Sequence, residues 1–112
     1  MSFITTHVLD TSNGKPAAGV KIILFRYEDE EWITIAGGST NTDGRITDLL
    51  EKNVIPVPGI YKLKFETKEY FDKDSIETFY PFIEIIFEIK DEEHYHVPLL
   101  LNPFGYSTYR GS

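Results

Sequence analysis

Three histidines carry the side chains best suited to chemistry in this sequence. His7 lies near the start of the chain, and His94 and His96 lie two residues apart near its end. An imidazole has an unperturbed pKa of about 6.5, so it can exchange a proton at neutral pH and serve as a general base. The other interpretation of His7 and His96 is structural, as polar residues at a strand edge or an interface.

Arg45 and the last four residues are further candidates. Arg45 follows Thr42-Asp43-Gly44, a sequence typical of a tight turn. Its planar guanidinium could bind a carbonyl-rich substrate or stabilise a developing oxyanion, or it could be an ordinary surface charge. The chain ends in Tyr109-Arg110-Gly111-Ser112, and a chain end taken by itself is expected to be frayed.

A metal site is a second hypothesis for the paired histidines. His94 and His96 share one face of a strand, so they could bind a metal ion together with a third ligand. Such a site needs more ligands close by, and Glu92 and Glu93 look like an ordinary charged turn. We therefore predict neither a metal nor a cofactor, and we expect His94 to be exposed to solvent where the strand begins.

Composition excludes other classes of function. The sequence has no cysteine, which excludes disulfides and a thiol nucleophile, and it lacks the Gly-x-Ser-x-Gly and phosphate-loop motifs. A net charge of −7 and a pI near 4.8 argue against a nucleic-acid partner. The longest nearly apolar run, 97–101, is too short to cross a membrane. The first residues do not resemble a secretory signal, so a cytoplasmic location is expected.

Strands are the elements that must hold these side chains. Apolar and polar residues alternate in several short segments, and the length of 112 residues fits one domain, 1–112. The exception is 67–74, where Thr67 in N-cap position precedes a charged segment and one or two helical turns are expected. The sequence therefore predicts an all-β sandwich or barrel. Strands are expected over 2–10, 20–27, 32–39, 59–67, 82–89, 95–102 and 105–110, with a short one near Arg45.

The alternation also predicts which faces of two strands are buried. In the strand 95–102, the residues of the core face are Tyr95, Val97, Leu99 and Leu101. The opposite face carries His96, Pro98 and Leu100. In the first strand, Ile4, Thr6 and Val8 lie on one face, and Thr5, His7 and Leu9 lie on the other. A partly apolar face that holds a histidine predicts contact with another subunit or a ligand.

Four short motifs occur in order along the chain. They are Thr6-His7-Val8-Leu9-Asp10 with Gly14-Lys15-Pro16-Ala17, Thr42-Asp43-Gly44-Arg45, His94-Tyr95-His96-Val97-Pro98-Leu99-Leu100, and Tyr109-Arg110-Gly111-Ser112. By these motifs the chain resembles the hydroxyisourate hydrolase branch of the transthyretin-like family, over essentially its whole length. Transthyretins have lysine, an acidic residue and threonine at the positions of His7, Arg45 and His96, and a longer tail. At all four places this sequence resembles the enzymes.

The resemblance implies a fold and an assembly. The implied fold is the transthyretin-like, or prealbumin-like, two-sheet sandwich with one short helix. Subunits would pair edge to edge, and the dimers would pack face to face into a homotetramer, a dimer of dimers. The active sites would lie in the channel between dimers, each built from two subunits. The face that carries His7 and His96 would line this channel, joined by Ser107 and Tyr109.

The resemblance also implies an activity and its residues. The substrate would be 5-hydroxyisourate, whose ring amide is hydrolysed to 2-oxo-4-hydroxy-4-carboxy-5-ureidoimidazoline in urate degradation. His7 and His96 would be the general base and its orienting partner, in an order that the sequence leaves open, and Arg45 would stabilise the oxyanion. Of the tail residues, Tyr109 and Ser112 would close the pocket, and Arg110 and Gly111 would shape the tail.

Two alternatives differ in class from this enzyme. The first is a transthyretin-like carrier that keeps the channel but catalyses no reaction; His7, Arg45, His96 and the terminal tetrapeptide argue against it. The second is a structural or interaction β-domain of a larger protein, which would be monomeric with a polar outer face. The partly apolar outer faces of the two histidine-bearing strands argue against that reading.

Overall fold

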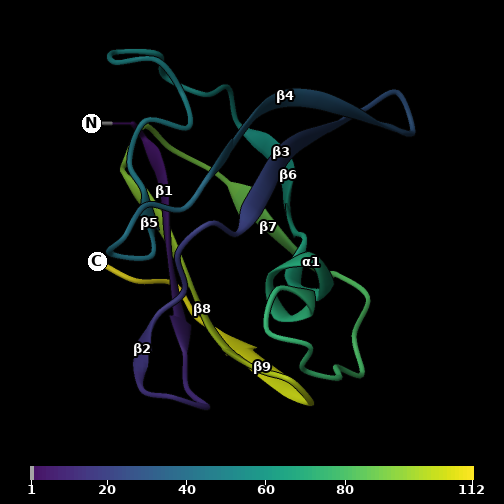
Figure 1. Ribbon diagram of the computed structural model, residues 1–112. Coiled ribbons are helices and arrows are strands. Elements are labelled where there is room, and N and C mark those ends of the chain that lie inside the picture. The colour runs from purple at the N-terminus through teal and green to yellow at the C-terminus, as the bar shows by residue number, and fades with distance from the viewer. Residues whose placement is uncertain (1) are drawn as a thin grey trace.

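The computed structural model describes residues 2–112 as two β-sheets and one short helix (Figure 1). The elements, in chain order, are β1 (Ile4–Asp10), β2 (Lys15–Pro16), β3 (Lys21–Glu28), β4 (Glu31–Ser39), β5 (Arg45–Ile46), β6 (Gly59–Phe65), α1 (Thr67–Asp72), β7 (Ile83–Ile89), β8 (Tyr95–Asn102) and β9 (Gly105–Thr108). The predicted all-β sandwich with a short helix is confirmed. Within residues 2–112, no helix is long and apolar enough to cross a membrane.

Strands that are distant in sequence are neighbours in the first sheet. Its order is β2-β1-β8-β9, and β5 also pairs with β1. The second sheet has the order β4-β3-β6-β7. β1 and β8 run parallel, and the other paired strands are antiparallel. The parallel pair brings the start and the end of the chain into one sheet.

The core lies between the inner faces of the two sheets. The first sheet contributes Val8 and Leu99, and the second contributes Leu24 and Leu63, all fully buried. In β8 the predicted core face is confirmed: Tyr95, Val97, Leu99 and Leu101 are each at most 6% exposed. On the opposite face, His96 and Leu100 remain half-buried, as do His7 and Leu9 of β1. Alternation therefore turns both histidines away from the core.

Two local features differ from the prediction. β2 was not predicted, because a two-residue strand of exposed Lys15 and Pro16 shows no alternation to recognise. The prediction of Thr67 as the N-cap is wrong. Glu66 is the N-cap residue, without a side-chain capping bond, and Thr67 is buried inside the first turn. Burial of Thr67 and Phe71 against the protein, rather than capping, holds this helix in place.

The helix α1 is also tied to the first sheet by a hydrogen bond. The Tyr70 hydroxyl donates to a carboxylate oxygen of Asp10, at the end of β1, over 2.8 Å. Burial and this carboxylate raise the pKa of Tyr70 far above its ordinary value. Asp10 is 2% exposed and lies on the face of β1 opposite to His7. Its carboxylate therefore interacts with Tyr70 and not with the histidines.

Candidate active site

Four neighbouring segments bring some of the predicted site residues together at the first sheet. Arg45 of β5 lies opposite His7 of β1, and Thr5 of β1 lies opposite His96 of β8. Beyond β8, the chain end crosses His96, where the Gly111 amide donates to the His96 carbonyl over 2.9 Å. Cross-strand neighbours have side chains within contact range of each other, so this register brings residues from both chain ends together.

The turn before Arg45 is built around one side chain. The side-chain oxygen of Asn41 accepts hydrogen bonds from the amides of Asp43 and Arg45, at 2.9 and 3.0 Å. Gly44 has a φ of +73°, a left-handed conformation that glycine adopts without strain, and its carbonyl accepts from the Val8 amide over 2.7 Å. The predicted tight turn is confirmed, and it fixes the backbone of Arg45 against β1.

A small pocket gathers the polar groups of this face. It has a volume of about 150 Å³ and brings together three of the predicted catalytic residues, Arg45, His96 and Ser112. The other lining residues are Thr5, Thr6, Thr47 and His94. His7 does not line this pocket but stands directly beside Arg45. Sequence reasoning missed Thr5 as a functional candidate, although its alternation places it on the same strand face as His7.

The Thr5 hydroxyl links two of the histidines. Its Oγ1 lies 2.8 Å from Nε2 of His94 and 2.8 Å from Nδ1 of His96. The expectation that His94 is solvent-exposed is therefore wrong: His94 is half-buried, because its ring turns toward this hydroxyl and lies roughly parallel to that of His96, at a tilt of 23°. Since Nδ1 of His96 is engaged by Thr5, Nε2 is the nitrogen left for a substrate.

The surroundings favour the neutral form of both candidate bases. Burial and the positive charge of Arg45 lower the pKa of His7 below its ordinary value. The pKa of His96 is also lowered, first by burial, then by Arg45, and further by His94 and His7. A neutral imidazole has a free lone pair, so it can accept a proton, while the guanidinium stays charged for a developing anion. The arrangement can therefore activate water and stabilise an oxyanion.

Gly111 lies so close to His96 that a larger residue does not fit. A Cβ at position 111 would be 2.6 Å from Cδ2 of His96 and 3.1 Å from Cγ of Pro98. Because real Cβ atoms are not found at the shorter of these distances, the ring would have to move. The tail is thus packed against β8 rather than frayed, and it brings Ser112 to the pocket.

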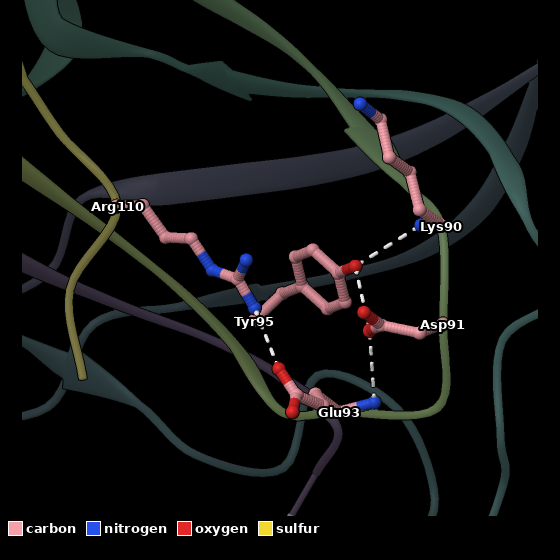
Figure 2. Close-up of polar contacts among 5 residues, drawn as sticks. All are labelled: Lys90, Asp91, Glu93, Tyr95 and Arg110. Atoms are coloured by element: carbon pink, nitrogen blue, oxygen red, sulfur yellow. Dashed lines mark hydrogen bonds and ion pairs between the residues drawn. The ribbon is translucent and has the colours of Figure 1, made fainter.

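Arg110 points to a different part of the molecule. Figure 2 shows its guanidinium against the ring of Tyr95, 4.2 Å from the centroid, with an ion pair to Glu93 at 3.6 Å. The Tyr95 hydroxyl donates to Asp91 over 2.8 Å and accepts from the Lys90 amide over 3.0 Å. The Tyr95 hydroxyl, the Glu93 amide and Arg110 lower the pKa of Asp91. This network ties the chain end to Tyr95 and Glu93 through Arg110.

A second, larger pocket lies next to this network. It has a volume of about 440 Å³, and Tyr109 and Arg110 line it together with Tyr95, His96 and residues of β7. Tyr109 and Arg110 are therefore not brought together with Arg45 and Ser112 within this chain. Among the described residues, His96 alone lines both pockets. Within residues 2–112, no group of three or more potential metal ligands comes together.

Comparison with known proteins gives a consistent family. The model of the HIUase/Transthyretin family matches residues 4–111. The 5-hydroxyisourate hydrolase of Halalkalibacterium halodurans is 48% identical over 116 residues, which cover 97% of this chain and 97% of that protein. The 5-hydroxyisourate hydrolase of Mus musculus is 46% identical over 112 residues, which cover 97% of this chain and 94% of that protein.

Solved structures extend the comparison to the backbone. The 5-hydroxyisourate hydrolase of Klebsiella pneumoniae has a TM-score of 0.85 at 39% identity, covering 97% of this chain and 98% of that one. Sea bream transthyretin in complex with thyroxine has a TM-score of 0.91 at 31% identity, covering 98% of this chain and 95% of that one. By sequence and by fold, this chain belongs to the HIUase/transthyretin family.

Proposed function

We propose that this protein is a 5-hydroxyisourate hydrolase of urate degradation. The observation that carries the proposal is the small pocket in which Arg45, His96 and Ser112 meet beside His7. Relatives of this chain that bear the name 5-hydroxyisourate hydrolase are 45–48% identical to it over nearly its whole length. A neutral imidazole can supply the general base for the hydrolysis of an amide, and a guanidinium can stabilise the oxyanion.

The reaction that we propose uses these groups in turn. His96 takes a proton from water through Nε2, and the water oxygen bonds to the ring carbonyl carbon. The carbonyl oxygen becomes an oxyanion, which the Arg45 guanidinium stabilises by hydrogen bonds and charge. The carbon–nitrogen bond of the ring then breaks, and the leaving nitrogen takes the proton back from the imidazolium. A carboxylic acid and an opened ring result, with no change in oxidation state.

The other predicted site residues have supporting roles in this proposal. His7, beside Arg45, orients the guanidinium or the water, and Ser112 closes the pocket on its open side. Gly111 sets the position of the tail over His96. Arg110 holds the tail through Tyr95 and Glu93, and Tyr109 lies on the far side of His96, where it reaches the substrate or a neighbouring subunit.

A carrier function is the competing candidate, because the structure superposes well on a transthyretin that holds thyroxine. Two features of this chain favour catalysis. Arg45 and His96 share one pocket. By the resemblance described above, transthyretins have an acidic residue and a threonine at these two positions. Gly111 pairs with His96, and Ser112 reaches the same pocket.

The assembly that we propose is a homotetramer with sites in the channel between dimers. Of the strands that end the two sheets, β7 and β9 each have one edge without a paired strand within residues 2–112. The larger pocket, with apolar Ile86 and Phe87 in its lining, lies between them. Free strand edges are ready to pair with another chain, and a second copy of this chain would continue both sheets at once.

The first prediction concerns activity. The protein should accelerate the ultraviolet decay of freshly generated 5-hydroxyisourate, and His96→Asn or His7→Asn should reduce the rate by about two to four orders of magnitude, the range for a lost acid-base group. Asparagine keeps the polarity and approximate size but cannot take up the proton. Full activity in both variants would show that the site is elsewhere, and a folded protein without any activity would favour the carrier.

The second prediction concerns pH. Because burial and Arg45 hold the pKa of His96 below 6.5, kcat/KM should stay high below pH 6.5 and fall only when the pH drops through the lowered pKa. Arg45→Gln removes one of the two main causes, so the pKa rises and the acidic fall moves to higher pH. Lys21→Gln, an exposed charge on the other sheet, is the control. If kcat/KM of Arg45→Gln fell at the same acidic pH as that of the wild type, His96 would not be the base.

The third prediction concerns the tail. Gly111→Ala should lower kcat by about ten- to a hundredfold, because small displacements of a catalytic group have effects of this size. The control is Gly105→Ala in β9, where a Cβ would meet its nearest atom at an ordinary 3.6 Å. Steady-state kinetics of both folded variants make the comparison. Equal rates in both variants would contradict the packing of the tail on His96.

The fourth prediction concerns the assembly. Analytical ultracentrifugation at micromolar concentration should show a species four times the mass of the 12.9 kDa chain. Such a tetramer is expected because both free strand edges become paired only in an oligomer. A stable monomer with full hydrolase activity would contradict both the tetramer and the site shared by two subunits.

A further inference from the structure

The hydroxyl of Thr5 makes two short contacts that constrain each other. Its Oγ1 is 2.8 Å from an imidazole nitrogen of His94 and 2.8 Å from one of His96. The residue is 4% exposed, so water has little access to satisfy it. A hydroxyl has one proton to donate and lone pairs to accept, whereas each nitrogen of a neutral imidazole either donates or accepts.

Only two proton arrangements satisfy every group in this chain of contacts. If both rings donated to Thr5, the buried hydroxyl proton would have no partner; if both rings accepted, one contact would have no proton. One ring therefore donates to Thr5 while the other accepts from it. The tautomers of His94 and His96 are coupled through a single oxygen, and the state of one ring sets that of the other.

The surroundings of His96 select one of the two arrangements. His96 lines the pocket that also holds Arg45 and Ser112. The positive charge of the Arg45 guanidinium favours an unprotonated nitrogen toward this pocket, because an N–H directed at it would be repelled. With Nδ1 held at the Thr5 hydroxyl, the proton of a neutral His96 is then on Nδ1. The Thr5 hydroxyl then donates to Nε2 of His94.

We propose that Thr5 and His94 are positioning residues that hold His96 as its Nδ1–H tautomer, with the lone pair of Nε2 directed to the pocket. This inference rests on the proposed function, in which Nε2 takes the proton from water. Neither Thr5 nor His94 exchanges a proton with the substrate. They act through His96, as a partner that fixes the second ring nitrogen acts on a catalytic or metal-bound histidine elsewhere.

The arrangement also has a consequence for the step after proton uptake. When Nε2 of His96 becomes protonated, the Nδ1–H donor to Thr5 remains in place, so no hydrogen bond has to be broken or remade. The opposite tautomer has its proton on Nε2 and cannot act as a base without losing it first. The contact through Thr5 therefore decides whether His96 is ready to react.

The direct test is nuclear magnetic resonance of the full-length protein labelled with ¹⁵N at histidine. At a pH where the imidazoles are neutral, Nδ1 of His96 should resonate as a protonated nitrogen and Nε2 as an unprotonated one. In Thr5→Val, which keeps the shape and removes the hydroxyl, the two resonances should move toward a mixture of tautomers. A wild-type His96 that is protonated on Nε2 would overturn the proposal.

Kinetics separate a positioning role from a merely structural one. Thr5→Val should lower kcat by roughly ten- to a hundredfold, the usual effect of losing such an orienting partner, with KM changed less than about twofold. Thr5→Ser restores the hydroxyl and should recover most of the lost rate. Thr34→Val makes the same substitution at an exposed site of β4 and should change neither kcat nor the His96 resonances.

A pair of substitutions tests His94 in the same way. His94→Gln keeps an acceptor for the Thr5 hydroxyl and should retain more kcat than His94→Phe, which keeps a flat ring without one. Unchanged kcat in Thr5→Val, or equal kcat in the two His94 variants, would overturn the positioning role of Thr5 and His94 but not the hydrolase function. If the wild-type protein had no hydrolase activity, only the proposed function would be overturned, because the resonances report the tautomer of His96 independently of activity.

Discussion

The parallel pairing of β1 with β8 is the constraint on which the site depends. Its register sets Thr5 beside His96 and His7 beside Pro98. The same register sends Val8 and Leu99 into the core, where both are fully buried. A slip of one residue would exchange the two faces, exposing apolar side chains and burying the imidazoles without partners. Apolar burial on one side of the sheet therefore enforces the geometry of the histidines on the other.

The distribution of charge complements this geometry. The protein carries a net charge of −7, yet its histidines gather around Arg45. A buried carboxylate next to His96 would raise the pKa of the imidazole and hold it protonated, which would remove the base. The one carboxylate buried in β1, Asp10, instead accepts hydrogen bonds from Tyr70 and Ser12 on the other face. This carboxylate therefore lies away from the sheet face on which Arg45 and the histidines gather.

Backbone similarity does not separate the two activities known in this family. The TM-score is 0.91 with a transthyretin and 0.85 with a hydrolase, so the carrier is at least as similar in fold as the enzyme. Sequence identity runs the other way, at 31% and 39%. One sandwich can hold either function, so the function has to be argued from side chains rather than from the fold. Arg45 and His96, on one sheet face, are the side chains on which the proposed hydrolase depends.

The sequence predicts what local rules determine and misses what distant pairing determines. Alternation along a strand is local, so it identified the core face of β8 and the outward direction of His7 and His96. The contacts of Thr5 join residues 89 and 91 positions apart, and neither histidine partner follows from the strand pattern alone. Local rules also mistook Thr67 for an N-cap and treated the chain end as frayed. That end is ordered by Gly111, where the lack of a side chain lets the backbone rest on His96. The residue with the least chemistry of its own therefore determines how the tail meets His96.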